Sequence, residues 1–309
     1  MKNILYAVLL IASNMVSASN PTDAEIMDEF LESLYLGIST NKSTVIAVGE
    51  RGHIALSKDY GSTWQQAKSV PTRTTLTAVT MIGNNAWAVG HDTTILHSSD
   101  GGENWVSQFE DKDRQMPLLD VMFINESEGF AIGAYGTYLT TFDGGNNWKD
   151  SLIVEDQDYH LNKIIKIDEY RFFVVAEAGN AYRSFDAGKN WELIELPYSG
   201  SMFGVVNYGN QIITYGLRGN VLVSEDFGDS FLQLDTPVQN SLFGSAVTAS
   251  NDLFLVGANG VVLKYQENKL KKVNFESSDG DYTGLLSIKE GKFIFIGDSG
   301  INTKVMGSK

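Results

Sequence analysis

Residues Ala47–Trp64 read AVGERGHIALSKDYGSTW and combine two short motifs that recur along the chain. The first is an apolar stretch that usually ends in Gly-x-x-Gly. Its seven copies have the lead positions Gly49, Gly90, Gly133, Ala176, Gly216, Gly257 and Gly297, separated by 41, 43, 43, 40, 41 and 40 residues. A period of about forty residues is typical of one four-stranded unit per repeat, and such units close into a ring. The sequence therefore predicts an all-β fold, a single seven-bladed β-propeller with four-stranded antiparallel blades.

The second motif, Ser-x-Asp-x-Gly-x-x-Trp, follows the first by one strand in five repeats and resembles the Asp box of the bacterial neuraminidase repeat. Its carboxylate can accept hydrogen bonds from its own turn, its glycine adopts a positive φ, and its aromatic residue packs between sheets. We therefore expect structural roles for its aspartates and aromatic residues, which are Asp59, Trp64, Asp100, Trp105, Asp143, Trp148, Asp186, Trp191, Asp226 and Phe231.

The N-terminus carries the features of a secretory signal. Lys2 precedes an apolar run from Ile4 to Ala12, and a small-x-small pattern ends at Ala18. This pattern predicts a signal peptide over residues 1–18, cleaved after Ala18. The run is too short for a permanent membrane helix. We expect an exported protein, soluble after cleavage and located in a bacterial periplasm.

Residues 19–33 are predicted to form an N-terminal arm or short helix before a propeller over residues 34–306. Thr22 and Glu25 form a capping box, and Ile26, Phe30, Leu31 and Leu34 share one helical face. A helix packed on the ring is the main expectation, and a partner-binding arm is the alternative. The seventh repeat lacks a fourth strand. Some of residues 19–33 are candidates to supply it, although their helical pattern argues against this.

The composition of the chain excludes some classes of partner. The chain has no cysteine, so an exported form depends on core burial. Removing Lys2 with the signal peptide leaves 22 basic residues against 38 acidic ones, a net charge near −16. Such a surface repels nucleic acid and anionic lipid. A basic or neutral protein partner, or a neutral ligand, is favoured, with no direct membrane insertion.

Propeller geometry sorts the polar residues between two rims. The turn between the second and third strand of each blade shares one rim with the connection to the next blade, and the Asp boxes lie on the opposite rim. Hairpin turns favour Asn, Asp and Gly, so Arg, His and Tyr on this first rim indicate binding. The predicted partner-binding residues are Glu50, Arg51, Arg73, His91, Asp92, Arg114, Tyr135, His160, Glu177, Tyr198 and Arg218.

The sequence gives no sign of a metal or cofactor. His53, His91 and His160 fall near the same rim, but no histidine shows paired ligand spacing, and His97 lies within a strand. No nucleophile elbow, phosphate loop or dinucleotide fingerprint is present. We predict no catalytic residues, no metal and no cofactor.

The alternation of Gly-x-x-Gly hairpins with Asp boxes resembles the photosystem II assembly and stability factor propellers, over roughly Leu34 to Val305. It is closest to exported bacterial members outside photosynthesis, which carry runs like VPTR, PLLDV, GAYG, AEAG, PY-G-FG and GLRG. These runs begin here at Val70, Pro117, Gly133, Ala176, Pro197 and Gly216. The resemblance implies a scaffold without catalysis, monomeric on its own. Its implied partner is an exported segment of an inner-membrane protein, such as a transporter of the resistance-nodulation-division superfamily.

In the photosynthetic members an arginine-rich patch is thought to hold a nascent reaction-centre subunit. Arg51, Arg73, Arg114 and Arg218 match that patch in location and type. The alternative is a sialidase-like or other glycoside hydrolase, or a carbohydrate-binding propeller, because Tyr135, Glu177 and Asp92 share the rim with the arginines. Sialidases have six blades, however, and no spacing here specifies two carboxyl groups at a catalytic separation.

Overall fold

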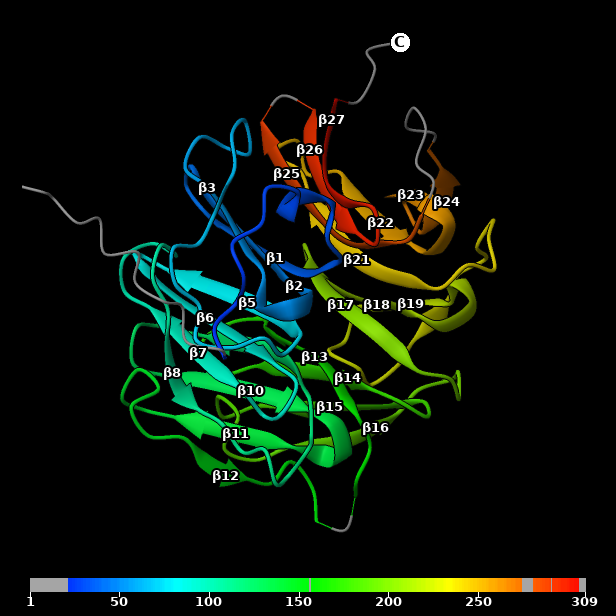
Figure 1. The fold of residues 1–309 in the computed structure, drawn as a ribbon. Helices are drawn as coiled ribbons and strands as arrows, with labels where there is room; N and C mark the ends of the chain where they lie inside the picture. Colours follow the sequence, from blue (N-terminus) through cyan, green and yellow to red (C-terminus); the bar gives the residue numbers. More distant parts are fainter. Residues whose placement is uncertain (1–21, 156, 274–279, 290, 306–309) are drawn as a thin grey trace, which may run out of the picture.

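The computed structural model describes residues 22–155, 157–273, 280–289 and 291–305. The predicted signal peptide and its cleavage site lie outside these ranges. Seven antiparallel sheets follow one another around a ring (Figure 1), which confirms the predicted seven-bladed propeller. Within the described ranges, no helix is long and apolar enough to cross a membrane.

Each of the first four blades has four strands, here called A to D from the channel outward. Blade 1 contains β1 (Tyr35–Asn41), β2 (Thr44–Gly49), β3 (Ile54–Ser57) and β4 (Gln65–Gln66). Blade 2 contains β5 (Leu76–Ile82), β6 (Asn85–Gly90), β7 (Ile95–Ser98) and β8 (Val106–Phe109). Blade 3 contains β9 (Leu118–Phe123), β10 (Gly129–Gly133), β11 (Tyr138–Thr141) and β12 (Lys149–Ser151). Blade 4 contains β13 (Leu161–Lys166), β14 (Phe172–Ala176), β15 (Asn180–Ser184) and β16 (Glu192–Glu195).

Blades 5 and 6 repeat this plan, and blade 7 has three strands among the described residues. Blade 5 contains β17 (Met202–Tyr208), β18 (Gln211–Gly216), β19 (Val221–Ser224) and β20 (Leu232–Gln233). Blade 6 contains β21 (Leu242–Val247), β22 (Leu253–Gly257), β23 (Val262–Gln266) and β24 (Lys269–Lys272). Blade 7 contains β25 (Tyr282–Lys289), β26 (Lys292–Gly297) and β27 (Gly300–Val305). The 3-10 turns are η1 (Phe30–Glu32), η2 (Glu50–Gly52), η3 (Ala134–Gly136), η4 (Leu217–Gly219) and η5 (Ala258–Gly260).

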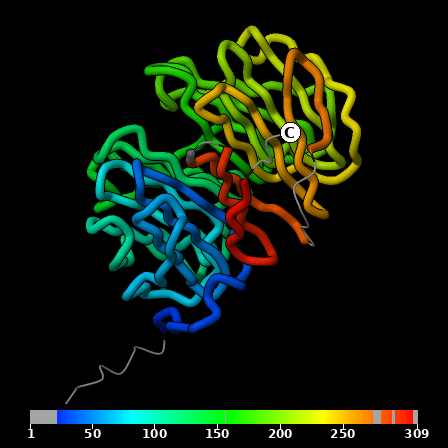
Figure 2. The backbone as a smooth tube through the Cα atoms, turned by 90° about the horizontal axis from the view of Figure 1, so that it is seen from above, coloured from blue at the N-terminus to red at the C-terminus, as the bar shows by residue number. Residues whose placement is uncertain are grey.

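The core is divided among seven apolar clusters, and each cluster fills the space between two neighbouring blades. The first joins Ile46 and Leu56 of blade 1 to Leu96 and Trp105 of blade 2. The last joins blade 1 to Ile294 and Ile296 of blade 7. The first and last blades therefore meet at one seam, where the blue and red segments lie side by side (Figures 1 and 2).

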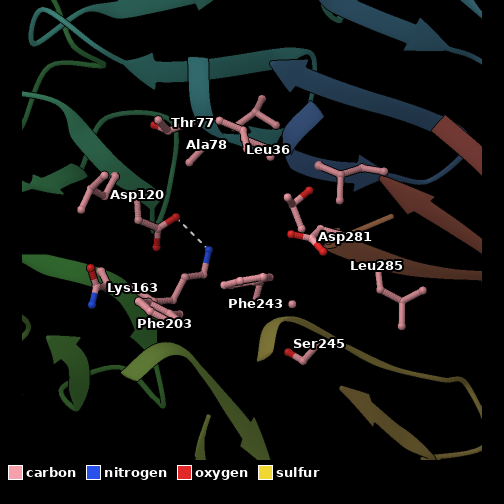
Figure 3. Close-up of a pocket in the computed structure, with 18 of the residues that line it drawn as sticks. Leu36, Thr77, Ala78, Asp120, Lys163, Phe203, Phe243, Ser245, Asp281 and Leu285 are labelled. Carbon is pink, nitrogen blue, oxygen red and sulfur yellow. Dashed lines mark hydrogen bonds and ion pairs between the residues drawn. The ribbon is translucent and has the colours of Figure 1, made fainter. Parts of the chain in front are cut away.

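The A strands surround the central channel, where side chains of successive blades face one cavity (Figure 3). At one end, each hairpin between strands B and C bonds to the connection that enters its blade, as in Glu50 N to Leu34 O at 3.0 Å and His91 N to Thr75 O at 2.9 Å. These hairpins and connections are called the hairpin rim. At the other end, the Asp-box turns bond to the A–B turns, as in Gly101 N to Asn84 O at 2.9 Å. These turns are called the box rim.

Every A strand carries a β-bulge next to its first residue. The bulge draws the start of the strand close to the lead glycine of its own blade. A Cβ atom added at Gly49 would lie 2.0 Å from Leu34 O, and one at Gly257 would lie 1.9 Å from Ser241 O. The lead glycines are thus required by close backbone approach, since Gly49 itself has an extended φ of −164°.

The N-terminal segment departs from the prediction of a helix. Over residues 22–34 the only helical element is the three-residue turn η1. Backbone groups of the segment bond instead to blade 1, through Ala24 N to Val70 O at 2.9 Å and Met27 N to Gln66 Oε1 at 2.9 Å. These hydrogen bonds to blade 1 replace the bonds that a helix would make within the segment. Tertiary contacts thus outweigh the helical tendency of the local sequence. No strand from this segment pairs with the three strands of blade 7 in the described part of the chain.

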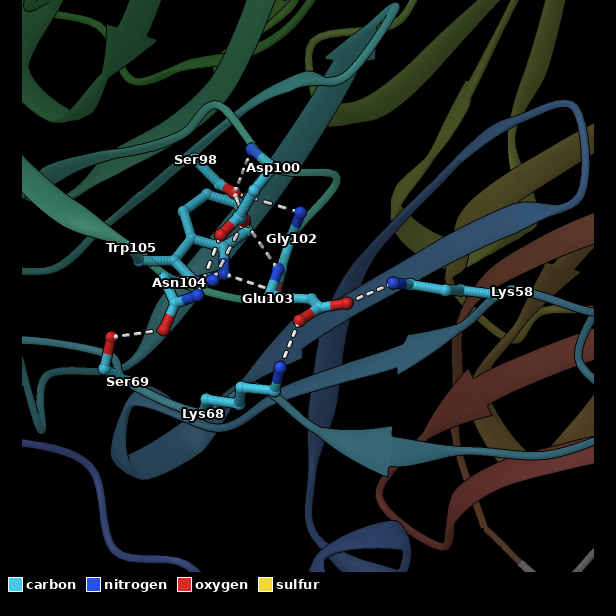
Figure 4. Close-up of polar contacts among 9 residues, drawn as sticks. All are labelled: Lys58, Lys68, Ser69, Ser98, Asp100, Gly102, Glu103, Asn104 and Trp105. Atoms are coloured by element: carbon cyan, nitrogen blue, oxygen red, sulfur yellow. Dashed lines mark hydrogen bonds and ion pairs between the residues drawn. The ribbon is translucent and has the colours of Figure 1, made fainter.

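The Asp boxes are closed networks of hydrogen bonds within their own turns. In blade 2, Asp100 Oδ1 accepts bonds from Glu103 N and Asn104 N, both at 3.0 Å, and Ser98 Oγ accepts one from Gly102 N at 2.9 Å (Figure 4). Glu103 of this turn also pairs with Lys58 and Lys68 of blade 1. The box therefore shapes its own turn and ties it to the preceding blade.

The box aromatic residues differ in burial more than the sequence implied. Trp105 is 3% exposed and donates its indole N–H to Gly102 O at 3.0 Å. Trp148 is half-buried, packs edge-on against Phe123, and its indole nitrogen has no hydrogen-bond partner among the described residues. The most buried tryptophan is Trp87 of β6, outside the boxes, which donates to Gly144 O of blade 3 at 3.1 Å.

Replacing Trp105 by Ala should lower the free energy of unfolding by about 3–5 kcal/mol, because it empties a buried aromatic site between blades 1 and 2. Trp148→Ala should lower it less, since that ring is already partly exposed and makes no hydrogen bond among the described residues. Urea unfolding followed by circular dichroism measures both. Equal losses for the two variants would contradict this ranking.

Low pH should weaken the hydrogen bonds that the Asp-box carboxylates accept. Hydrogen bonds from the side chain and backbone of Thr63 lower the pKa of Asp59 to about 2, and those of Ser230 lower the pKa of Asp226 to about 2. An unfolded Asp titrates near 3.9. The stabilisation is therefore present above about pH 4 and is lost as the pH falls toward 2. The urea concentration at the unfolding midpoint should therefore fall between about pH 4 and pH 2. In the Asp59→Asn, Asp226→Asn variant this fall should be smaller. A fall as steep as that of the wild type would show that these two carboxylates do not cause it.

Candidate functional site

The tips of the hairpin rim hold non-glycine residues in left-handed backbone conformations. Arg51 has a φ of 55°, Tyr135 of 53° and Arg218 of 57°. All three side chains are exposed. A left-handed conformation costs an L-residue about 1–2 kcal/mol, and Asn or Gly would fit these tips with less strain. Three large side chains therefore point outward from positions where Asn or Gly would give a more stable hairpin.

Arg51 and Arg218 lie on the hairpins of blades 1 and 5, whereas Arg73 and Arg114 lie on the connections that follow blades 1 and 2. Arg73 donates its Nε to Asp23 O at 2.8 Å and pairs with Glu25 at 2.9 Å, so the N-terminal segment holds it. Arg114 pairs with Asp150 of β12 at 2.8 Å. Within the described ranges, Arg51 and Arg218 have no ion pair. Only these two of the four are free to meet a partner.

Tyr135, His160 and Glu177 come together between blades 3 and 4. The rings of Tyr135 and His160 meet edge to face, with centroids 4.9 Å apart. Glu177 Oε1 accepts a bond from the backbone N–H of His160 at 2.8 Å, and its Oε2 lies 3.7 Å from His160 Nδ1. Glu177 therefore fixes the connection that carries His160, and Tyr135 covers it from outside.

The remaining predicted rim residues have mixed positions. Glu50 accepts a bond from Leu34 N at 3.2 Å, as Glu177 does from His160 in blade 4. Tyr198 is half-buried and donates to Leu217 O at 3.3 Å, which makes it largely structural. His91 is exposed on the hairpin of blade 2, and Asp92 beside it has a φ of 55°.

His53 follows the hairpin of blade 1 but faces inward. It is 1% exposed, and its Nδ1 lies 2.9 Å from Ser33 Oγ. Burial lowers its pKa below the usual histidine range. His53 is therefore a neutral core residue near physiological pH and is not a surface ligand.

Sequence reasoning missed the ring of residues at the mouth of the channel. The extra residue of each A-strand bulge lines the cavity, and the seven are Leu36, Thr77, Leu119, Asn162, Phe203, Phe243 and Thr283. Because A strands begin at the hairpin rim, this ring lies at the same end of the molecule as the exposed arginines. A sign of the bulge exists in the sequence, where the apolar pairs Leu118–Leu119, Met202–Phe203 and Leu242–Phe243 break strand alternation.

The polar members of the ring bond to the next blade. Thr77 Oγ1 donates to Leu118 O at 2.7 Å, Asn162 Nδ2 to Met202 O at 2.9 Å, and Thr283 Oγ1 to Tyr35 O at 2.6 Å. In each case the acceptor is the first A-strand residue of the following blade. These hydrogen bonds stabilise the ring. They use donors of the three side chains that could otherwise bind a ligand in the channel.

One ion pair spans the channel wall between blades 3 and 4. Asp120 is 2% exposed, and it accepts bonds from Lys163 Nζ at 2.8 Å and from Ile164 N at 3.0 Å (Figure 3). Further around the wall, between blades 5 and 6, burial raises the pKa of Tyr215 to about 12, and its hydroxyl bonds to Ser245 Oγ at 3.0 Å. The Asp120 carboxylate and the Tyr215 hydroxyl thus both have hydrogen-bond partners within the protein.

The arrangement offers little to a metal or a hydrolytic centre. Among the described residues, no group of three or more His, Asp or Glu side chains could hold a metal ion. Tyr135 and Glu177 both contact His160, whereas Asp92 belongs to blade 2 and has no contact with either in the part of the chain described. The three residues considered for a glycosidase are therefore not assembled into one site.

A family model described as "Photosynthesis system II assembly factor YCF48" matches residues 25–117 and 108–213, more than half of the chain. The chain belongs to this family. Solved structures support the same fold: "YCF48 bound to D1 peptide" is 18% identical with a TM-score of 0.74, covering 94% of this chain and 98% of its own. YCF48 from Cyanidioschyzon merolae is 16% identical with a TM-score of 0.71, covering 92% and 98%.

The propeller fold of this assembly factor family is shared with proteins of other kinds. A streptogramin B lyase is 12% identical with a TM-score of 0.75, covering 88% of this chain and 93% of the lyase. None of the curated proteins compared with the chain matches it. At these identities the structural matches establish the fold alone, so function must be argued from the residues of the rim.

The left-handed tips give a test of stored strain. Arg218→Gly should raise the free energy of unfolding by about 0.5–1 kcal/mol, because glycine tolerates positive φ and only part of the gain is offset by its flexibility. Lys166→Gly, at the exposed end of β13, is the control and should lower stability by about the same amount. Urea unfolding measures both, and a loss of stability in Arg218→Gly would disprove the strain.

Proposed function

We propose that this chain is a non-catalytic, exported scaffold that binds an exported segment of an inner-membrane protein, a transporter or an assembly client, through the hairpin rim. The observation that carries the proposal is the strained outward placement of Arg51, Tyr135 and Arg218 at the hairpin tips. The hairpin itself requires the left-handed conformation, which Asp92, Ala178 and Asn259 share, but it does not require Arg or Tyr at the tip. Residues kept in such conformations where Asn or Gly would cost less are concentrated at functional sites. Arg and Tyr are also enriched among the residues that dominate interface energies.

The distribution of charge also favours the hairpin rim as the binding surface. The whole chain carries a net charge of −15, yet Arg51 and Arg218 present unpaired guanidinium groups in the described structure. Guanidinium groups bind carboxylates and backbone carbonyls through directed hydrogen bonds. A client segment with such acceptors can dock here although the rest of the surface is acidic.

Family membership adds the class of partner. The solved YCF48 structure named above holds a peptide of D1, and we extend peptide binding to this chain by analogy. The leader-like residues 1–18 support export, so we place the encounter in the periplasm, with the client supplied by a neighbouring membrane.

The second candidate, a glycoside hydrolase, has one observation in its favour, the contact of Tyr135 and Glu177 with His160. Glu177, however, holds the backbone of His160 and is half-buried. Acid–base hydrolysis needs two carboxyl groups on either side of a glycosidic bond. Asp92 lies a blade away, so we propose that the rim has no catalytic role.

The double variant Arg51→Glu with Arg218→Glu should reduce client binding by at least about tenfold, because two favourable charge contacts become repulsive. The fold should persist, since both side chains are exposed. Chemical cross-linking in envelope extracts, followed by mass spectrometry, identifies the client, and titration of the purified client segment measures the loss.

The matched control is Lys149→Glu with Lys189→Glu, which makes the same change of charge on the box rim with exposed side chains. It should bind the client as the wild type does. Equal capture of one client by the wild type and the Arg51→Glu, Arg218→Glu variant would show that the hairpin rim is not the site.

A further inference from the structure

The mouth of the central channel is a cavity of about 640 Å³ that the rim residues above do not account for. Two aromatic side chains from neighbouring blades form part of its wall. The rings of Phe203 and Phe243 lie 5.6 Å apart, and both are partly exposed to the cavity (Figure 3). Aromatic bulge residues in adjacent blades leave apolar surface open at the end where a client would dock.

The carboxylates at this mouth are not neutralised. Asp281 Oδ1 accepts a bond from Asn259 N at 2.8 Å, and Asp298 Oδ1 accepts one from Asp281 N at 2.9 Å. Both residues line the cavity, and Asp281 points into it (Figure 3). No lysine or arginine pairs with either of them within the described ranges. Asp120, by contrast, already has Lys163 as its counter-ion.

We propose that the channel mouth binds one basic side chain, arginine or lysine, from the client segment, with its stem against Phe203 and Phe243 and its charge beside Asp281 and Asp298. The inference rests on the proposed function and specifies its client further. A cation is attracted both by carboxylates and by aromatic faces. A long basic side chain also has an apolar stem, which suits a wall that is aromatic on one side and acidic on another.

Other occupants fit this cavity less well. A carboxylate would meet two unpaired aspartates in a chain of net charge −15, and only Lys163 would attract it. A purely apolar side chain would cover Phe203 and Phe243 but would desolvate Asp281 without compensation. The polar bulge residues Thr77 and Asn162 already donate to backbone carbonyls, so they offer no alternative anchor.

Three probes of one shape and different charge test the proposal directly. Benzamidinium, benzamide and benzoate are titrated into the methyl-labelled mature protein, and the methyl groups of Val205 and Leu285, which line the cavity, are followed by NMR. The exposed Val106 of β8 is the control signal. We expect saturable shifts with benzamidinium, and binding at least about tenfold weaker with benzoate, because charge and ring act together only in the cation.

Two variants separate the contributions. Asp281→Asn with Asp298→Asn keeps an acceptor oxygen at each position and should reduce benzamidinium affinity to that of benzamide. Phe243→Ala should weaken both of these probes. Benzoate binding as tightly as benzamidinium, or no shift of the cavity methyl groups with any probe, would overturn the proposal.

The Arg51→Glu, Arg218→Glu variant distinguishes this inference from the proposed function, because neither arginine lines the cavity. It should bind benzamidinium as the wild type does while losing the client. If the client is lost only in that variant and binds the Asp281→Asn, Asp298→Asn protein normally, the rim is the site and the channel is not used. If the client binds the arginine variant normally, the proposed function itself fails.

Discussion

The burial of each blade against the next is the interaction on which the rest of the molecule depends. None of the seven apolar clusters belongs to one sheet, and the seventh joins blade 7 to blade 1. A single blade would expose both faces to water, so it has no stable form without its neighbours. The chain contains no cysteine, so no disulfide links the blades, and packing, hydrogen bonds and ion pairs hold the ring together.

Much of the architecture could be predicted from the sequence, because the devices that shape each blade are local. Asp59 acts within its own turn and Gly49 within its own blade, and both are recognisable from a few neighbouring residues. The helix predicted over residues 22–34 was wrong because bonds to Val70 and Gln66 of blade 1 replaced those within the segment. Local sequence does not show such distant partners.

The candidate site could be predicted only in outline, for the same reason. The sequence predicted that Arg73 and Arg114 lie on the hairpin rim, but it could not show that Glu25 and Asp150 pair with them. The channel wall was missed because a β-bulge adds one residue without changing the alternation elsewhere. Phe203 and Phe243 are adjacent in space although a whole repeat separates them in sequence. Residues that meet across blades are visible only once the ring is built.

The seam between blades 7 and 1 also sets the order of events when the chain is made. Thr283 bonds to Tyr35 across 248 positions, and Ile294 and Ile296 cover the apolar face of blade 1. Contacts this distant in sequence form slowly, because a long loop must close first. Blade 1 is synthesised first, yet its inner face stays open to water until the last blade arrives. The apolar surface of blade 1 that blade 7 covers is therefore the last to be buried, and until the ring closes it can pair with apolar surface on other chains.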